Sequence, residues 1–288
     1  MGGSATASQA QQASKDYETY FLSTSRLDED AVDDDTVTSS DRGNNNRDDG
    51  RSSFSDAIID GIQRNPYAAW EWGMVERVAQ NYDRAAEIHG LAASAFDDIG
   101  DRPRSVICSL DRGLDMASGM DDDAVMVGGS KGSKGDEKRK KPVAVEATRK
   151  ILEDAISSTV DVGGRDVELL QRVVAKEGEA RVALSGVLWT NTDSGGERGA
   201  AESQFGTACA RLDELNADYR NREADRIKRG RAPPVAPRGA SLGYSIDDIV
   251  GAEEAGCSRF KNEKFVEEKL VWSDGLRTLV RKFLTLSR

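Results

Sequence analysis

The chain has 288 residues, of which 38% are hydrophobic and 32% are charged, and its formal net charge is -11. This hydrophobic fraction is low for a compact α/β enzyme. It is typical of a protein whose helices bury one face each and whose remaining chain is partly disordered. The acidic balance disfavours nucleic acid and anionic membranes as general partners, because like charges repel.

Residues 1–52 consist mostly of Ser, Asp, Asn, Gln and Gly, and much of the acid lies between Asp28 and Asp49. We expect this segment to be a disordered acidic tail. Its exception is the aromatic run from Tyr17 to Leu22, for which a docking motif is the alternative to chance. Gly2 fits a loose myristoylation pattern that lacks a second lipid signal.

From Ser53 onward the apolar residues recur at helical spacing. They predict three antiparallel helical hairpins, which pair 66–79 with 82–98, 102–118 with 143–158, and 164–190 with 199–229. Residues 119–142 pass from acidic through Gly/Ser to basic, and we expect a flexible insertion there. Gly100 is expected to end the helix before it in a left-handed conformation.

The C-terminal region, 230–288, begins as a Pro/Gly loop and ends in helices. Ser245 is expected to cap a short helix there. The last helix is expected to start after Ser273 and to bury Leu276, Leu279, Val280, Phe283 and Leu284. It either caps the helical domain, 53–229, or docks on a partner. No set of strands and no run of membrane-spanning length is present, so we expect an all-α fold without a transmembrane helix.

The stretch from Asn65 to Asp101 resembles a tetratricopeptide repeat (TPR), whose hairpin combines aromatic and small residues with a Gly/Asp-Tyr turn. The matching residues are Trp70 or Trp72, Gly73, Asn81-Tyr82, Ala85 and Ala92. The resemblance implies a TPR-like α-solenoid or bundle, in which small residues let helices approach. TPR domains that clamp chaperone C-termini carry a Lys and an Asn where this chain has Trp70 and Met74, so the resemblance does not extend to that clamp.

The sequences of the longer predicted helices are also similar in their general residue pattern to those of TPR-like proteins of plant and algal plastids. This similarity implies a plastid rather than a cytoplasmic location, within a reducing compartment. The three cysteines, Cys108, Cys209 and Cys257, are far apart in the chain, and we expect free thiols.

Residues with the chemistry of catalysis are few. His89 is the only histidine, and we expect it to pack in a helix without metal or triad partners. Most helical carboxylates are expected on solvated faces, as in the pairs Glu168–Arg172 and Glu177–Arg181. Neither a calcium loop nor a phosphate loop has the required spacing, so we expect no cofactor and no metal.

Two basic clusters stand against the acidic mean: Lys138, Arg139, Lys140 and Lys141, and Arg226, Lys228, Arg229 and Arg231. A patch for nucleic acid, anions or lipid is one interpretation. A soluble linker for the first cluster and a cationic helix end for the second is the other.

We therefore expect a non-enzymatic scaffold or adaptor for protein–protein interaction, such as an assembly or accessory factor of a larger, photosynthetic complex. The residues expected to bind the partner are Tyr67, Trp70, Trp72, Tyr82, Arg226, Lys228, Arg229 and Arg231. One alternative is a nucleic-acid-binding helical-repeat protein that uses clusters 138–141 and 226–231. Another is an enzyme with a carboxylate-based site, which would need a deep pocket with converging, buried ionisable groups.

Overall fold

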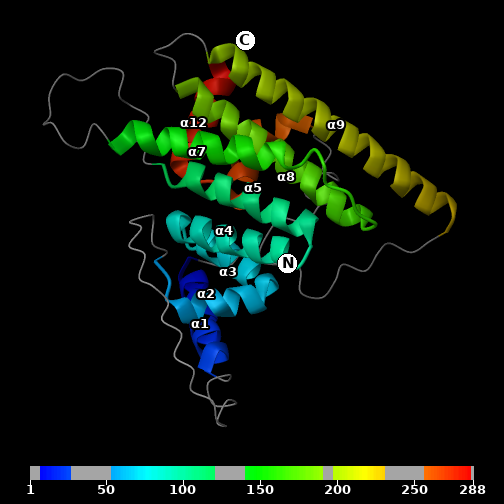
Figure 1. The fold of residues 1–288 in the computed structure, drawn as a ribbon. Coiled ribbons are helices and arrows are strands. Elements are labelled where there is room, and N and C mark those ends of the chain that lie inside the picture. Colours follow the sequence, from blue (N-terminus) through cyan, green and yellow to red (C-terminus); the bar gives the residue numbers. More distant parts are fainter. Residues whose placement is uncertain (1–6, 27–52, 121–139, 191–196, 231–255, 287–288) are drawn as a thin grey trace, which may run out of the picture.

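In the computed structural model, residues 7–26, 53–120, 140–190, 197–230 and 256–286 are described, and every regular element in them is a helix (Figure 1). The all-α prediction is confirmed for these ranges. The helices are α1 (Ala7–Arg26), α2 (Asp56–Arg64), α3 (Pro66–Val78), α4 (Tyr82–Asp98), α5 (Arg102–Ser118), α7 (Lys140–Ser157), α8 (Val167–Thr190), α9 (Arg198–Lys228), the 3-10 helix η3 (Gly256–Lys261), α11 (Glu263–Glu268) and α12 (Asp274–Leu286). None of them combines the length and hydropathy that crossing a bilayer requires.

The first predicted hairpin is formed by α3 and α4. Pro66 occupies the first turn of α3, and the side chain of Asn65 accepts a hydrogen bond from the Ala68 amide, which caps the helix. Gly100 follows α4 with a φ of 77°, the left-handed terminator that its position predicted.

The helices form two parts that share α5. In Figure 1 the blue and cyan helices α1–α4 lie below α5, and the green and yellow helices α7, α8 and α9 lie above it. The pairing of α8 with α9 is as predicted, whereas α5 packs against α4 and α8 as well as α7. The second hairpin is therefore not an isolated pair but the centre of the fold.

Two apolar clusters make the core. One surrounds Trp72 and includes Phe21, Ile62 and Phe96, and the other extends from α5 through α8 and α9 to α12. In the second cluster, a Cβ on Gly178 would lie 2.7 Å from the Leu212 side chain, and one on Gly186 would lie 3.0 Å from that of Val280. These two glycines therefore let α9 and α12 approach α8 closely.

The prediction that residues 1–52 form a disordered tail is wrong for 7–26. These residues form α1, which packs on α2 and α3 and buries Phe21 completely. The aromatic run that contains Phe21 therefore indicates packing. It is too short to have changed a prediction that rested on the polar composition of the whole segment. Residues 27–52 lie outside the described residues, as do 121–139 of the predicted insertion and the predicted cap at Ser245.

The last helix caps the domain. Leu276, Leu279, Val280 and Phe283 of α12 are buried, and the Phe283 ring meets Trp189 of α8 at a centroid distance of 5.4 Å. The hydroxyl of Ser273 accepts a hydrogen bond from the Leu276 amide, as expected for a cap. Of the two alternatives that the sequence left open, capping is the one observed.

A disulfide joins Cys209 of α9 to Cys257 of η3, so the expectation of free thiols is wrong for this pair. Their sequence separation of 48 concealed the bond, because sequence spacing says nothing about contacts between distant helices. Cys108 is a buried free thiol. Burial raises its pKa well above the ordinary value, with the carboxylate of Asp111 acting in the same direction.

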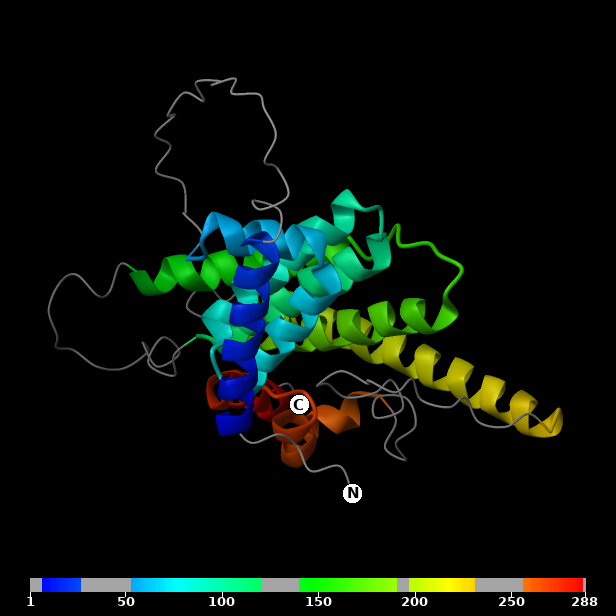
Figure 2. The same ribbon diagram turned by 90° about the horizontal axis from the view of Figure 1, so that it is seen from below.

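The second half of α9 leaves the core. Ala208, Leu212 and Leu215 of α9 are buried, but from Ala217 onward every α9 side chain that the structure describes is exposed. In Figure 2 this yellow end extends beyond the other helices.

Candidate functional site

The four aromatic residues selected from the sequence have different surroundings. Trp72 is fully buried, Trp70 and Tyr82 are half-buried, and Tyr67 is 47% exposed. Trp72 lies against Phe21 with 5.4 Å between ring centroids, which makes it a core residue. Only Tyr67 offers a largely accessible ring to a partner.

A buried group of charged side chains lies where α3, α4, α5 and α8 meet. Its centre is Arg77, which is 2% exposed. The Arg77 Nε lies 2.5 Å from Asp115 Oδ1, and its Nη1 lies 3.0 Å from Asp111 Oδ1. The Nη2 donates to the backbone carbonyl of Asp111 at 3.0 Å. The guanidinium therefore bridges two successive turns of α5.

Lysine and glutamate from α8 extend this group toward the C-terminal helices. Lys176 Nζ lies 2.9 Å from Asp111 Oδ1 and 3.0 Å from Glu179 Oε2. The indole N–H of Trp272 donates to Glu179 at 3.0 Å. The indole N–H of Trp70 donates to Asp111 at 3.3 Å. We call these side chains the buried ion network; its ionisable members are Arg77, His89, Asp111, Asp115, Lys176 and Glu179.

His89 belongs to this network, which corrects the expectation that it would lack chemical partners. Its Nδ1 lies 2.6 Å from Asp115 Oδ2, and the ring is fully buried. A Cβ on Gly73 would lie 2.5 Å from His89 Nε2. The small residue at position 73 is therefore what admits the imidazole between α3 and α4.

Two members of the network, Arg77 and Asp111, have pKa values shifted in favour of their charged forms. Burial opposes the charge of Arg77, but the carboxylates of Asp115 and Asp111 outweigh it and raise the pKa well above its usual value. Burial likewise opposes the charge of Asp111, but Lys176 and Arg77 outweigh it and hold the pKa well below its usual range. Opposite charges thus offset the cost of desolvation.

The ion pairs of this network join α3, α4, α5 and α8 to one another, and they are closed to solvent. Every ionisable member is less than a tenth exposed, so no substrate can reach these atoms without a movement of the helices. Within the described ranges, no three His, Cys, Asp or Glu side chains are placed to hold a metal ion. Converging buried ionisable groups are present, but none of them lines either of the two hollows described next.

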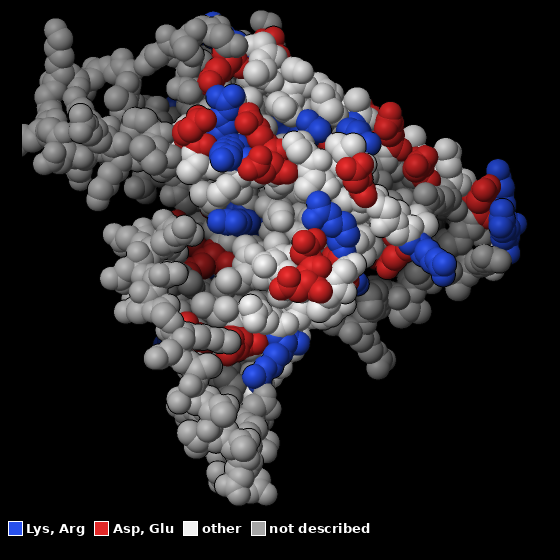
Figure 3. Space-filling model, viewed as in Figure 1, with Lys and Arg blue, Asp and Glu red and all other residues white. Residues whose placement is uncertain are grey.

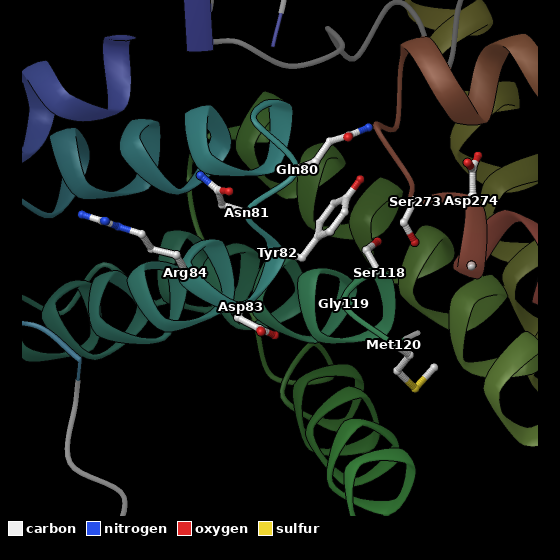
Figure 4. A pocket seen from close by; sticks show the side chains of 11 residues that line it. Gln80, Asn81, Tyr82, Asp83, Arg84, Ser118, Gly119, Met120, Ser273 and Asp274 are labelled. Carbon is white, nitrogen blue, oxygen red and sulfur yellow. The ribbon is translucent and has the colours of Figure 1, made fainter. Parts of the chain in front are cut away.

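A hollow of about 710 Å³ lies beside the network and is shown in Figure 4. Tyr82 stands in it between the α3–α4 turn and Ser273 at the start of α12, and its hydroxyl donates to the Val271 carbonyl at 3.5 Å. Burial raises the pKa of Tyr82 to about 12. Gln80 and Val271, at φ of 64° and 56°, border this ring with left-handed backbones. The hollow is wide and shallow, with mixed polar and apolar walls.

A second hollow, of about 460 Å³, lies at the joint between α3, the α4–α5 turn and the start of α8. Tyr67, Ile99, Pro103 and Leu169 supply its apolar lining. Tyr67 is fixed there by an edge contact to Phe96, 5.0 Å between centroids, and by the guanidinium of Arg104 at 5.2 Å from its ring. Tyr67 is thus the one sequence-selected aromatic that combines exposure with a fixed position.

The basic clusters do not meet. Figures 1 and 2 both place the start of α7, with Lys140 and Lys141, at the opposite end of the molecule from the end of α9. Lys228 and Arg229 are exposed there, whereas Arg231, Lys138, Arg139 and the side chain of Arg226 lie outside the described residues. On the face shown in Figure 3, basic and acidic residues alternate without a region of one sign.

The ion pairs predicted on the helices are present, with Arg172 3.2 Å from Glu168 and Arg181 2.9 Å from Glu177, but only the first pair is exposed. Glu177 is 2% exposed, and Glu76, Asp111, Asp115 and Glu179 are buried as well. The expectation that the carboxylates lie mostly on solvated faces is wrong for these. A signal was available, since Asp111 and Asp115 each follow a buried leucine one helical turn apart.

The chain matches no known protein family, and no curated protein and no solved structure is significantly similar to it. Any conclusion about its function therefore rests on its own residues and their geometry.

Proposed function

We propose that the chain is a non-enzymatic adaptor of TPR-like helical hairpins, and that it holds a partner protein at the hollow beside Tyr67. The observation that carries the proposal is the gathering of exposed apolar side chains there. Tyr67 and Ile99 line the hollow at 47% and 56% exposure. Val160 and Val167, 79% and 47% exposed, flank the segment that forms its far wall.

An exposed apolar group of this kind favours association. Burying Ile99 and Tyr67 against a partner would remove apolar surface from water, at about 25 cal/mol per Å². The lining also holds Asp101, Arg165 and Asp166, which supply a polar rim. The similarity in residue pattern to TPR-like proteins of plastids extends the proposal to an assembly or accessory factor of a larger complex in that compartment.

The test places a photo-crosslinking amino acid at position 99 of the full chain, followed by mass spectrometry of an extract from the native compartment. We expect one stoichiometric partner, whose yield falls at least tenfold when Tyr67→Asp is added. Position 22 is the matched control, because Leu22 is also exposed, at 37%, but lies on α1. The absence of a stoichiometric partner at position 99, or equal yields from both positions, would contradict the proposal.

The nucleic-acid alternative needs the two basic clusters to act together, and their separation counts against it. A salt titration distinguishes the two functions. Binding to nucleic acid through several phosphates weakens by orders of magnitude between about 50 and 200 mM salt. Binding at the Tyr67 hollow is expected to change little over the same range.

A further inference from the structure

Helix α1 contacts the rest of the protein along a narrow stripe. Ala10, Ser14, Tyr17 and Phe21 form it, at successive spacings of four, three and four residues, which places them on one helical face. The other described side chains of α1 are mostly exposed. By contrast, α5 buries more than half of its residues.

The surface under this stripe is shaped to receive it. A Cβ on Gly61 would lie 3.0 Å from the Phe21 ring, so the glycine of α2 makes the socket for that ring. The floor of the socket is Trp72. Farther along the stripe, Ala10 packs with Val75 and Ala79 of α3.

A buried carboxylate binds the side chain at the polar position of the stripe. The Ser14 hydroxyl donates to Glu76 Oε1 at 2.5 Å, and Glu76 is fully buried. Arg84 and Asn81 hold this carboxylate from the other side, at 3.0 Å and 2.8 Å. Arg84 belongs to α4 and Asn81 to the turn before it, so the residues that hold this carboxylate from that side are not part of α1.

The other polar contacts of the stripe lie nearer the solvent. The hydroxyl of Tyr17 donates to Glu71 at 3.0 Å, and the guanidinium of Arg84 lies 3.0 Å from Glu18. Burial, together with Glu71, raises the pKa of Tyr17 to about 12. These partly exposed contacts add orientation rather than large stability.

α1 is not fixed in place by chain length alone. Residues 27–52 separate it from the next described segment, and 26 residues can span up to about 90 Å. Among the described residues, the contacts of α1 with α2, α3 and α4 seat it, and the stripe supplies the buried ones.

We propose that the groove formed by Gly61, Trp72, Val75 and Glu76 is a receptor for amphipathic helices, and that α1 is its ligand in cis. The partner in trans is a helix that presents a small residue, a hydroxyl and two aromatic rings at the spacings of Ala10, Ser14, Tyr17 and Phe21. Its ring enters the socket at Gly61, and its hydroxyl binds Glu76. This groove is separate from the Tyr67 hollow, and the proposal stands without the one made there.

The test uses a fluorescent peptide with the sequence of residues 7–26 and the full-length chain. In the wild-type chain the seated α1 competes with the peptide at high effective concentration. In a Phe21→Asp chain, α1 loses its main anchor while the groove is intact. We expect the peptide to bind the Phe21→Asp chain at least tenfold more tightly than the wild-type chain.

Controls separate the groove from nonspecific attraction. A Leu22→Asp chain, altered on the exposed face of α1, should behave as the wild type, and a peptide carrying Phe21→Asp should bind neither chain. Equal binding of the original peptide to the wild-type and Phe21→Asp chains would overturn the proposal. So would a wild-type chain that forms a dimer by exchanging α1, because the ligand would then be a second copy.

Hydrogen exchange on the wild-type chain tests the same point without a substitution. The amides of α1 are expected to exchange at least a hundredfold faster than those of α5, because α1 opens by itself. Exchange of α1 and α5 at the same rate would mean that α1 leaves only when the whole protein unfolds, and would overturn the proposal.

Discussion

The contact between Gly73 and His89 fixes the separation of α3 and α4. A Cβ at position 73 would meet three atoms of the imidazole at 2.5–2.8 Å, too close for any side chain. We expect Gly73→Ala to lower the free energy of unfolding by about 1–3 kcal/mol, because the ring and its Asp115 bond must shift. Urea denaturation measures this change.

Gly206 supplies the matched control, since it lies in α9 with nothing within 4 Å of an added Cβ. Gly206→Ala should stabilise the chain by about 0.5–1 kcal/mol, because alanine loses less backbone freedom in a helix. A Gly73→Ala chain as stable as Gly206→Ala would show that the imidazole is not packed against α3.

Arg77 is the residue on which the buried ion network depends most. Arg77→Met keeps much of the volume but leaves Asp111 and Asp115 without their shared cation, so we expect a loss of about 3–5 kcal/mol. Arg172→Met is the control, because its partner Glu168 is exposed and the pair contributes under about 1 kcal/mol. Thermal unfolding of both variants tests the difference, and similar melting temperatures would contradict it.

Single residues were the hardest features to predict from the sequence. The small positions Gly73, Ala85 and Ala92 followed from the TPR resemblance, and all three are buried. His89 and Arg77 did not, because their partners come from α5, and a helical pattern does not say which faces of different helices meet.

At the scale of elements, the disulfide between α9 and η3 contributes separately to the free energy of unfolding. It closes a loop of 48 residues, for which the loss of chain entropy in the unfolded state corresponds to at most about 4 kcal/mol. We expect Cys257→Ser to lower the free energy of unfolding by about 2–4 kcal/mol. A reducing agent should lower the wild-type value equally and leave the variant unchanged, and a wild-type chain insensitive to reduction would contradict this.

The starts of α7 and α8 differ by three residues from the prediction, whereas α3, α4, α5 and α9 were predictable within one residue, because their apolar periodicity and caps lie in the local sequence. α1 was not, since its stripe holds only one large buried side chain, Phe21, among polar residues. The helix is positioned by its contacts with α2 and α3. The burial of Trp72, on the side of α3 that α1 covers, was missed for the same reason.

At the scale of the whole molecule, the buried ion network joins both parts of the fold, and its charge makes stability depend on pH. The pKa of Asp111 is lower in the folded chain than its ordinary value near 4, so its stabilisation is complete above about pH 4 and is lost as the pH falls further. We expect the free energy of unfolding to decline on acidification below that point. In Asp111→Asn the decline should be shallower by up to about 1.4 kcal/mol per pH unit.

Urea unfolding from pH 6 down to about 2.5 measures both slopes. Equal slopes for the wild type and Asp111→Asn would mean that other carboxylates govern acid unfolding. The sequence could predict an all-α chain with a C-terminal helix, but it could not predict this dependence, which arises from side chains that meet only in the folded state.

Three of the four tryptophans donate their indole N–H to a carboxylate: Trp70 to Asp111, Trp72 to Glu76 and Trp272 to Glu179. The intrinsic fluorescence of the protein is therefore coupled to its buried acids. Single-tryptophan variants would report separately on the groove under α1 and on the joint between α8 and the C-terminal helices, without an added dye. The release of α1 and the loosening of the centre of the fold would then be distinguishable as two optical signals from one sample.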